Sequence, residues 1–595
     1  MTESPTRLRR SLPMLALAAV SFAIGAIIGG AHSVSPSHKL ASQFVAAWVR
    51  RDYAAMYSDL DPPSQRAITP AAFEAAYRQA LTTATATSVR LAGKPSGRGE
   101  GIVAVPVLVH TNLFGTLRLS FMLKIVQQNG GEGDRVAWSR SMVFPGLLGG
   151  EQLNRITTLP RRAAMLARDS SVLAEGSPDV PAGEVTRSSP LGETASAVLG
   201  TVGPVPAARR QSLEAQGVPA DATVGLTGLE LALDDPLRGT PGGELLAESP
   251  QAAGTGRVLA SAVSRPAPAF RTSLSPAIQR AAVTALGGQL GGIVAMDPSS
   301  GRIVAVAGIG LDGLQPPGST FKMITLSGVL EAGIANPHTV FQYASYATLD
   351  GVRLNNANGE SCGGTLELAF AVSCNSVFTP LGVKLGATRL VSMAERFGFN
   401  QDTGVPGASQ STLPAASAIQ GELAVGSTAI GQGQVLATPL QMAIVAATIA
   451  DGGRRPKPTF EQGAAPVRLP AIGAGVARTV RRLMVGVVRT GTGTAAAIPG
   501  VTVAGKTGTA ELKTQCSSAG PEAASHEENG SAGGEGCASP SHQASNTDAW
   551  FAAFAPALRP RIVVSVLLVK DGAGGETAAP LARQVLEAGL QAGAR

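Results

Sequence analysis

The sequence is short of charged residues, aromatic residues and cysteines, and each shortage narrows what the protein can be. Charged residues make up 15% and aromatic residues 4% of the 595 residues, and the net charge of +7 is small for this length. No run of Lys and Arg interleaved with aromatic residues appears, so we expect no nucleic-acid partner. No internal repeat of fixed period is present, which argues against a solenoid or a propeller. The four cysteines do not follow the spacing of a structural zinc site, and we expect no metal ion and no cofactor.

The composition is otherwise that of a folded chain with several domains. Hydrophobic residues make up 44%, which argues against wholesale disorder, and the length allows at least one large core. Residues 12–31 form an uncharged run of 20 residues, the length that a helix needs to cross a bilayer. Three arginines precede it and none follows closely, so we predict a cytoplasmic tail over 1–11, a single transmembrane anchor over 12–31 and an extracytoplasmic bulk at the cell membrane. A cleaved signal peptide is the alternative. In both cases the bulk of the chain faces a compartment where disulfides persist.

Changes of composition divide the rest of the chain into three segments. Residues 34–148 are typical of a compact α+β unit, in which Thr69 is a plausible N-cap of a helix that begins with Pro70. Residues 149–265 are rich in Gly, Pro and Ser, with short strand-like runs. Over 270–595 the sequence predicts a helix, a hairpin around "DPSSG", several helices, two adjacent antiparallel strands and a closing helix. This order predicts an antiparallel sheet with helices against it.

A serine and a lysine three residues apart begin a helical pattern in "PPGSTFKMITLSGVLEAG". Such a pair shares one face of a helix, so the Ser319 hydroxyl and the Lys322 amine can meet. A serine needs a base to take its proton before it acts as a nucleophile, and a desolvated lysine can be that base. The other interpretation is that Ser319 caps the helix and Lys322 is a solvated charge.

Two more polar motifs follow later in the chain. "AVSCNSVF" supplies Ser373, which can relay a proton beside such a pair, and Asn375, whose amide can donate to and accept from a substrate. "VAGKTGTA" is typical of a strand that a ligand can approach closely, with a cation and hydroxyls suited to a carboxylate: Lys506, Thr507, Gly508 and Thr509. Taken alone, these motifs also fit a polar helix start and a sheet strand with an exposed lysine.

Together the motifs occur in the order S-x-x-K, S-x-N and K-T-G, which is the signature of penicillin-binding proteins and class A β-lactamases. The chain resembles a class B penicillin-binding protein, with S-C-N in place of S-D-N. "GQGQVLATPLQMA" at 431–443 resembles the family's segment between the second and third motifs, and "DAWFAAFAP" resembles the strand that pairs with the K-T-G strand. The resemblance implies an α+β, penicilloyl-serine transferase (β-lactamase-like) transpeptidase domain over 270–595, with an antiparallel sheet and a helical subdomain.

The resemblance also assigns the two preceding segments. Residues 149–265 resemble the β-rich pedestal, or dimerisation, domain, with "GLTGLE" as the clearest feature, although "RRAAMLARDSSVLAEG" matches the family's usual R-G-x-I-x-D-R-N-G stretch only loosely. Residues 34–148 resemble the small nuclear-transport-factor-2-like domain of the methicillin-resistance type, most clearly at "WSRSMVFPGLLGGE". The region before the pedestal is too short for a glycosyltransferase domain.

The activity that the resemblance implies is serine acyl transfer. The enzyme would be a serine-type D-Ala-D-Ala transpeptidase that crosslinks peptidoglycan stem peptides through an acyl-enzyme and is itself acylated by β-lactam antibiotics. Ser319 would be the nucleophile, Lys322 its base and Ser373 a proton relay. Lys506 would tune this cluster. A polytopic glycosyltransferase of the division or elongation machinery is a possible partner.

The resemblance implies roles for the remaining motif residues in substrate binding. Asn375 would hold a substrate amide, and Thr507 and Thr509 would bind the terminal carboxylate beside Gly508. The backbone N–H groups of Ser319 and Thr509 would form the oxyanion hole.

Three other functions fit parts of the pattern. A D,D-carboxypeptidase or β-lactamase would use water in place of the acceptor amine, but the anchor and the two N-terminal segments favour the transpeptidase. A β-lactam sensor would have several spans or a cytoplasmic effector. A catalytically inactive scaffold for division proteins would not need every motif side chain. The choice between a role in division and a role in elongation stays open.

The four cysteines permit three full pairings. A bridge from Cys362 to Cys374 would pin the loop that carries Ser373 and Asn375, whereas the alternative is a buried free thiol at Cys374. Cys516 and Cys537 bracket a polar insertion over 512–547 and could close it as a loop. That insertion is either a tolerated surface loop or a lid or docking element at the rim of the cleft.

Overall fold

The computed structural model describes residues 35–127, 133–176, 187–249, 256–511 and 547–592. The predicted tail and anchor, Cys516, Cys537 and nearly all of the polar insertion lie outside these residues. None of the helices described is long and apolar enough to cross a membrane.

The chain forms two compact units. Unit 1 is Met1–Leu159, Val205–Asp221 and Thr240–Arg265, and unit 2 is Pro160–Pro204, Ala222–Gly239 and Pro266–Arg595. The segment predicted as the pedestal therefore contributes to both units, and the predicted domain boundaries stay a prediction.

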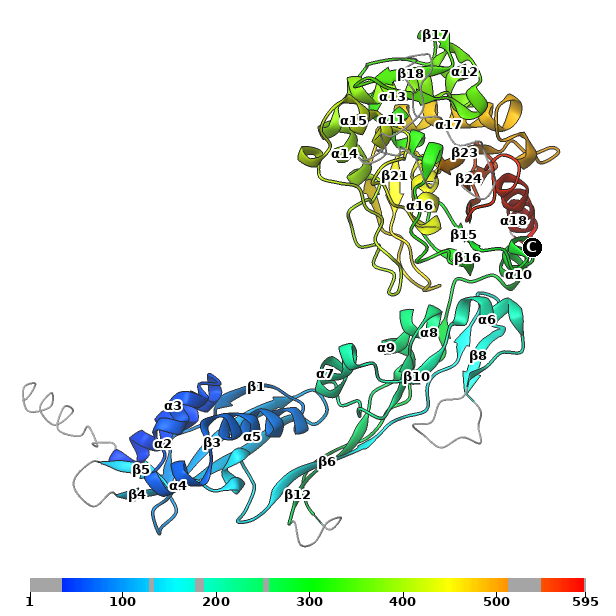
Figure 1. The fold of residues 1–595 in the computed structure, drawn as a ribbon. Helices are drawn as coiled ribbons and strands as arrows, with labels where there is room; N and C mark the ends of the chain where they lie inside the picture. The colour runs from blue at the N-terminus through cyan, green and yellow to red at the C-terminus, as the bar shows by residue number, and fades with distance from the viewer. Residues whose placement is uncertain (1–34, 128–132, 177–186, 250–255, 512–546, 593–595) are drawn as a thin grey trace, which may run out of the picture. The chain divides into compact units, whose positions relative to one another are not determined.

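Unit 1 consists of helices and two antiparallel sheets (Figure 1). As predicted, Pro70 begins a helix and the Thr69 side chain caps it by accepting from the Ala72 backbone N–H. In the core, Trp48 packs edge to face on Phe121. The helices are α2 (Pro36–Val49), α3 (Tyr53–Ser58), α4 (Pro62–Ala67), α5 (Pro70–Thr83), η1 (Arg140–Val143) and α7 (Ala207–Ala215). The first sheet has the order β1-β3-β4-β5, with β2 beside β3, and the second β13-β12-β6. The strands are β1 (Ala86–Leu91), β2 (Ser96–Gly97), β3 (Ile102–Thr111), β4 (Gly115–Gln127), β5 (Asp134–Val136), β6 (Gln152–Thr158), β12 (Gly242–Glu248) and β13 (Arg257–Ala262).

The first part of unit 2 is held by a buried ion-pair network. Arg162 lies 2.7 Å from both Glu230 and Asp234, and Arg187 lies 2.6 Å from Glu230. Glu230 ends the "GLTGLE" stretch, so this motif is a structural anchor. Loss of one partner would leave an uncompensated buried charge. The elements here are β7 (Met165–Leu166), β8 (Val172–Gly176), β9 (Arg187–Ser188), α6 (Glu193–Leu199), β10 (Val202–Pro204), β11 (Thr223–Gly225), α8 (Gly228–Ala232), α9 (Asp234–Arg238) and β14 (Phe270–Arg271).

The main body of unit 2 is a five-stranded antiparallel sheet in the order β16-β15-β25-β24-β23 (Figure 1). Helices α10 (Pro276–Leu286) and α18 (Ala578–Ala592) pack on one face, and α16 (Pro439–Ala450) packs on the other. Both faces are covered, which explains why β24 and β25 are buried along their whole length and largely apolar rather than alternating. The strands are β15 (Gly291–Met296), β16 (Ile303–Gly308), β23 (Ala504–Glu511), β24 (Thr547–Ala555) and β25 (Ile562–Leu568). The predicted hairpin, strand pair and closing helix are therefore confirmed.

A helical subdomain adjoins the sheet and carries two of the three motifs. Its helices are η2 (Gly318–Phe321), α11 (Lys322–Glu331), η3 (Ala357–Gly359), α12 (Leu366–Ala371), α13 (Asn375–Leu385), α14 (Ala387–Arg396), η4 (Ala416–Ala418), α15 (Glu422–Ala429), α17 (Ala474–Thr490) and η5 (Thr494–Ala496). Short strands complete it: β17 (Val340–Ala344), β18 (Tyr346–Leu349), β19 (Val352–Asn355), β20 (Cys362–Thr365), β21 (Arg454–Pro456) and β22 (Arg468–Pro470). Because α11 is buried along most of its length, the residues at its start are fixed by packing.

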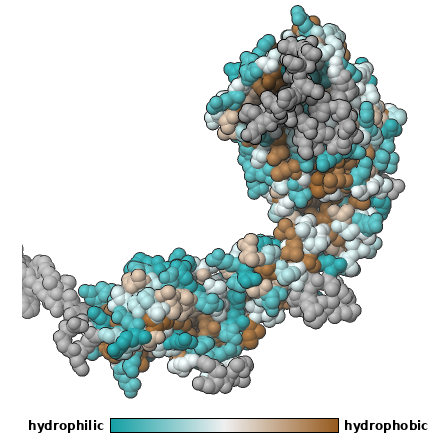
Figure 2. Space-filling view, viewed as in Figure 1, coloured by the Kyte–Doolittle hydropathy of each residue, from teal (hydrophilic) through white to brown (hydrophobic). Residues whose placement is uncertain are grey.

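Hydrophobic residues reach the surface among hydrophilic ones in both units (Figure 2). Val263, Val340 and Leu558 are each more than 70% exposed. Exposed apolar side chains of this kind are ordinary on folded domains and are not by themselves a binding surface.

Candidate active site

The turn that carries Ser319 lies directly against the K-T-G strand. Ser319 is in η2, and Gly318 before it has a φ of +51°. A Cβ on Gly318 would lie 3.0 Å from the Thr509 carbonyl oxygen, and one on Gly508 would lie 2.7 Å from the Pro317 oxygen. Glycine at both positions therefore allows the two backbones to approach closely. The sequence predicted Ser319 and Gly508 as site residues, and the fold brings them together.

Lys322 is a fully buried amine in contact with the second motif. Its Nζ donates to the Ser373 backbone oxygen and to Asn375 Oδ1, both at 2.6 Å, and lies 3.4 Å from Ser373 Oγ. The side chain is 0% exposed, and its Nζ lies 5.5 Å from the centroid of the Phe378 ring. Lys322 is therefore not the solvated charge of the alternative interpretation.

Lys506 approaches the same serine from the sheet. Its Nζ donates to Ser373 Oγ at 2.8 Å and to the Thr507 backbone oxygen at 3.0 Å. It is also 0% exposed, with its Nζ 5.5 Å from the Phe370 ring centroid. The Ser373 hydroxyl therefore lies between two buried lysine amines that come from different parts of the chain.

Burial lowers the pKa of both lysines, and the charge of Lys506 lowers that of Lys322 further. Burial, and then the charge of Lys506, hold the pKa of Lys322 well below its ordinary value of 10.5. Burial lowers the pKa of Lys506 to about 7. Both shifts have the sign expected when a cation loses its water and gains no carboxylate. A neutral Lys322 amine can accept a proton near neutral pH.

The Ser319 hydroxyl stands apart from this network. Within the part of the chain that the structure describes, Lys322 Nζ makes its hydrogen bonds to Ser373 and Asn375 and none to Ser319 Oγ. Catalytic hydrogen bonds are often long or absent without substrate and form in the substrate complex. Since Ser319 lies one turn before Lys322, the two side chains start from neighbouring positions.

Ser373 has a backbone conformation that its surroundings must hold. Its φ of +60° is left-handed, which costs a non-glycine residue about 1–2 kcal/mol. The next residue, Cys374, forms a disulfide with Cys362 and donates its backbone N–H to the Ala369 oxygen at 2.8 Å. Of the two alternatives for Cys374, a disulfide or a buried free thiol, the structure has the disulfide. The bridged residue is the middle residue of the S-x-N motif.

We expect that loss of this disulfide lowers the rate of acylation while the protein stays folded. The protein with Cys362→Ser and Cys374→Ser should lose about 3 kcal/mol of unfolding free energy, the value for a loop of similar length. Its rate of covalent penicillin labelling should fall about tenfold, because Ser373 and Asn375 lose their tether. Chemical denaturation and fluorescent-penicillin kinetics measure the two effects. Dithiothreitol should slow wild-type labelling and leave the double variant unaffected; an equal effect on both would contradict the tether.

Two asparagines that the sequence reasoning missed position the S-x-N motif. Asn375 Nδ2 donates to the Asn355 backbone oxygen at 2.9 Å. The Asn356 amide is buried, accepts from the Ser376 backbone N–H at 2.8 Å and donates to the Ala344 oxygen at 2.7 Å. These contacts join the start of α13 to β17 and to the end of β19. No sequence motif indicates these two asparagines, because only the fold brings them into contact with the S-x-N segment.

The two threonines of the K-T-G strand lie on the opposite face of the strand from Lys506. Side chains alternate along a strand, so Thr507 and Thr509 lie opposite Lys506 and Gly508. The hydroxyl groups of Thr507 and Thr492 are hydrogen-bonded at 2.6 Å, and Thr509 Oγ1 accepts from the Gly574 backbone N–H at 3.4 Å. Thr492 is a second contact that the sequence did not reveal. The predicted carboxylate role of the two threonines stays a prediction.

Comparison of the sequence with protein families and known proteins identifies the family of this chain. A family model described as the penicillin-binding protein transpeptidase domain matches residues 291–587, a dimerisation-domain model matches 180–267, and an NTF2-like N-terminal transpeptidase domain model matches 36–151. The chain is 32% identical over 383 residues to the peptidoglycan D,D-transpeptidase PbpA of Mycobacterium tuberculosis, covering 54% of this chain and 72% of that protein. This chain belongs to the penicillin-binding protein transpeptidase family.

Other relatives and solved structures agree with this membership. The peptidoglycan D,D-transpeptidase MrdA of Acinetobacter baumannii is 28% identical over 465 residues, which cover 68% of this chain and 66% of that protein. A D,D-transpeptidase domain of a peptidoglycan glycosyltransferase from Eggerthella lenta aligns with a TM-score of 0.55 at 28% identity, over 73% of this chain and 98% of that chain. Penicillin-binding protein A from M. tuberculosis, as a ceftriaxone acyl-enzyme complex, aligns with a TM-score of 0.56 at 27% identity, over 72% and 98%. The predicted family and fold class of this penicillin-binding protein are thus confirmed.

Proposed function

We propose that this penicillin-binding protein is a serine-type peptidoglycan D,D-transpeptidase, which crosslinks stem peptides and is acylated by β-lactams. Family membership supports the reaction class. The observation that carries the assignment of residues is the convergence of Lys322 and Lys506 on Ser373, beside the turn that bears Ser319.

In the proposed first step the Ser319 hydroxyl attacks the carbonyl carbon between the two terminal D-alanines. Lys322, neutral because of its lowered pKa, takes the hydroxyl proton. The backbone N–H groups of Ser319 and Thr509 stabilise the oxyanion, which is supported by the close approach of η2 to β23. Ser373 passes a proton to the departing D-alanine nitrogen. The product is an ester on Ser319.

In the second step an amine of another stem peptide attacks that ester. Its proton returns through the same lysine and serine groups, and Ser319 leaves as the free hydroxyl. Asn375 holds a substrate amide, a role supported by the fixed position of its side chain between Lys322 Nζ and the Asn355 oxygen. Thr507 and Thr509 bind the terminal carboxylate, and Lys506, on the opposite face of the strand, tunes the Ser373 hydroxyl, a role supported by its hydrogen bond to that group.

The proposed cellular setting follows from the sequence. Residues 12–31 anchor the chain as a single span, with the bulk outside the cytoplasm. A polytopic glycosyltransferase of the division or elongation machinery would supply the glycan strands, and peptidoglycan stem peptides are the substrates.

The experiment that tests the function follows the fate of a stem pentapeptide ending in D-Ala-D-Ala. Detergent-solubilised full-length protein is incubated with this peptide and an excess of a D-amino acid as acceptor amine, and products are identified by mass spectrometry. A transpeptidase releases D-alanine and forms the acceptor-linked peptide. Formation of the tetrapeptide alone would identify a carboxypeptidase, and rapid turnover of penicillin a β-lactamase.

Acylation should decline as pH rises through about 7. Lys506 has a pKa of about 7, so its ammonium form predominates below that pH and is lost above it. The ammonium group that donates to the Ser373 hydroxyl is lost with it, so the proton relay weakens and the second-order rate constant of acylation should fall. In Lys506→Arg the guanidinium stays charged, and the falling limb should disappear even if the rate is lower throughout. A falling limb of unchanged pKa in this variant would assign it to another group.

A further inference from the structure

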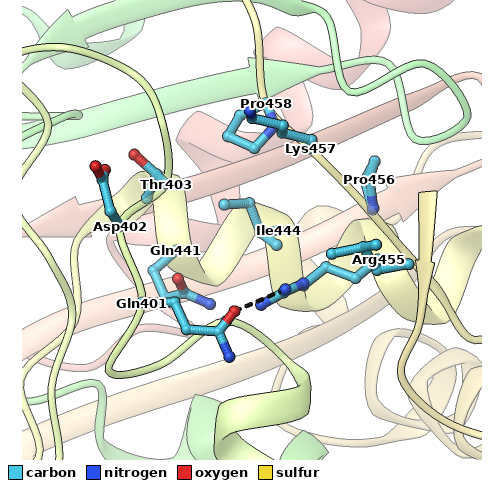
Figure 3. Close-up of a pocket in the computed structure, with 11 residues that line it drawn as sticks. Gln401, Asp402, Thr403, Gln441, Ile444, Arg455, Pro456, Lys457 and Pro458 are labelled. Carbon is cyan, nitrogen blue, oxygen red and sulfur yellow. Dashed lines mark hydrogen bonds between the residues drawn. The ribbon is translucent and has the colours of Figure 1, made fainter. Parts of the chain in front are cut away.

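A cavity lies in unit 2, apart from the proposed catalytic residues. It has a volume of about 240 Å³ and is enclosed by the segment after α14, by α16 and by β21, β22 and the residues that follow β21 (Figure 3). Neither Ser319 nor any of the residues bonded to Lys322 or Lys506 lines it.

The most informative residue of this cavity is Arg455. Its guanidinium donates to Gln401 Oε1 at 2.8 Å and to the Glu395 backbone oxygen at 3.5 Å, and both acceptors are neutral (Figure 3). In the part of the chain that the structure describes, no carboxylate forms an ion pair with it. Burial alone lowers its pKa, and no neighbouring acid opposes that shift. A half-buried cation whose hydrogen bonds go to neutral acceptors favours an anionic ligand.

The groups around Arg455 hold polar atoms in fixed positions at the wall of the cavity. Gln441 is 1% exposed, and its Nε2 donates to the Phe397 oxygen at 2.9 Å, which fixes the amide. A Cβ on Gly398 would lie 2.8 Å from Arg455 Nη1 and 3.2 Å from Gln441 Nε2. Glycine at 398 therefore lets the guanidinium and the amide pack closely against the backbone at this wall of the cavity. In Figure 3, Gln401, Gln441 and Arg455 point toward one another.

The charge balance of the lining is positive. Lys457 follows Arg455 by two residues, and Asp402 is the single acid among the lining residues, which are all described. The Asp402 carboxylate accepts from the Gly404 backbone N–H at 2.8 Å, and a Cβ on Gly404 would lie 3.4 Å from Lys457 Nζ. Lys457 and Asp402 thus lie near each other at the Gly404 turn, which leaves the charge of Arg455 unbalanced.

The remaining lining is apolar. Ile444 is 3% exposed and projects from α16, and Pro456, Pro458 and Leu469 also line the cavity. A ligand that fits must therefore join one anionic group to a short hydrocarbon part. We propose that this cavity binds a small aliphatic monocarboxylate, with its carboxylate on the Arg455 guanidinium and its alkyl part against Ile444 and Pro456.

The test uses a probe and a neutral analogue of the same shape. Full-length protein, first acylated with penicillin so that the Ser319 site is filled, is titrated with isobutyrate or isobutyramide, and binding is measured by saturation-transfer NMR. We expect saturable binding of isobutyrate with a Kd on the order of 1 mM, given so few ligand atoms. We expect at least tenfold weaker binding of isobutyramide.

Matched variants locate the binding. Arg455→Gln should abolish the isobutyrate signal, whereas Arg454→Gln, at the exposed neighbouring position, should keep it. Lys457→Gln should weaken binding two- to fivefold and serves if Arg455→Gln does not fold, which penicillin labelling of each variant reports. Binding that survives Arg455→Gln, equal binding of isobutyramide, or no saturable signal at 20-fold the expected Kd would each overturn the proposal. The proposed crosslinking reaction is tested separately, because these readouts use acylation by penicillin but no turnover of a stem peptide.

Discussion

Replacing Ser319 with Ala should abolish covalent labelling by fluorescent penicillin. The proposed ester forms through the Ser319 hydroxyl oxygen, and no other group of the site occupies the turn against β23. Ser373, the next candidate, has its hydroxyl bound by Lys506 at 2.8 Å and lies close to Lys322, so it is placed to move protons rather than to form the ester. Labelling should fall below 0.1% of the wild-type rate, in line with loss of an essential nucleophile.

A matched control separates this loss from a folding defect. Ser327 lies on the same helix as Lys322, is fully buried and donates its hydroxyl to the Met323 backbone oxygen at 2.7 Å, away from the other motifs. Ser327→Ala should label at close to the wild-type rate. Peptide mapping of the labelled wild type should place the adduct on Ser319. An adduct on another residue, or labelled Ser319→Ala protein, would overturn the assignment.

Replacing Lys322 with Met should lower the acylation rate about 10³-fold with Ser319 still present, the usual size of a general-base effect. Methionine keeps most of the volume of the side chain and removes the amine, so the Ser319 hydroxyl loses its proton acceptor. The same change removes the donor that fixes Asn375 Oδ1 and the Ser373 oxygen. Stopped-flow or gel-based labelling kinetics measure the rate.

Stability distinguishes a catalytic role of Lys322 from a structural one. A buried amine without a carboxylate partner is costly, and apolar replacement of buried polar groups is often neutral for folding. We therefore expect the thermal midpoint of Lys322→Met to stay within a few degrees of wild type. Lys384→Met, at an exposed position on α13, is the control and should change neither property. A variant that labels at the wild-type rate would remove Lys322 from the mechanism.

The sequence was a good guide wherever the structure is local. The turn residues around "DPSSG", the Thr69 cap before Pro70 and the apolar runs of β24 and β25 each indicated their element correctly. The order of the three motifs was enough to predict the family and the α+β fold. These features depend on a few neighbouring residues, whose conformational preferences are readable in isolation.

The contacts between the motifs could not be predicted from the conformational preferences of neighbouring residues. Ser319 and Lys322 were expected to meet because they share a helix face, yet the hydrogen bonds of Lys322 go to Ser373 and Asn375. Thr492 and Asn356 carry no motif, although they hold Thr507 and the start of α13. Such partners depend on the side-chain packing of distant segments.

By itself, then, the sequence determined which chemical groups the protein has, which family it belongs to and where several of its helices and strands lie. The tertiary structure alone decided that Lys322 and Lys506 are both buried around one serine hydroxyl. This arrangement has a physical consequence, because burial lowers the pKa of both lysines and the charge of Lys506 lowers that of Lys322 further. No local pattern specifies that environment: Ser373 and Lys506 are 133 residues apart and meet only when the sheet packs against the helical subdomain.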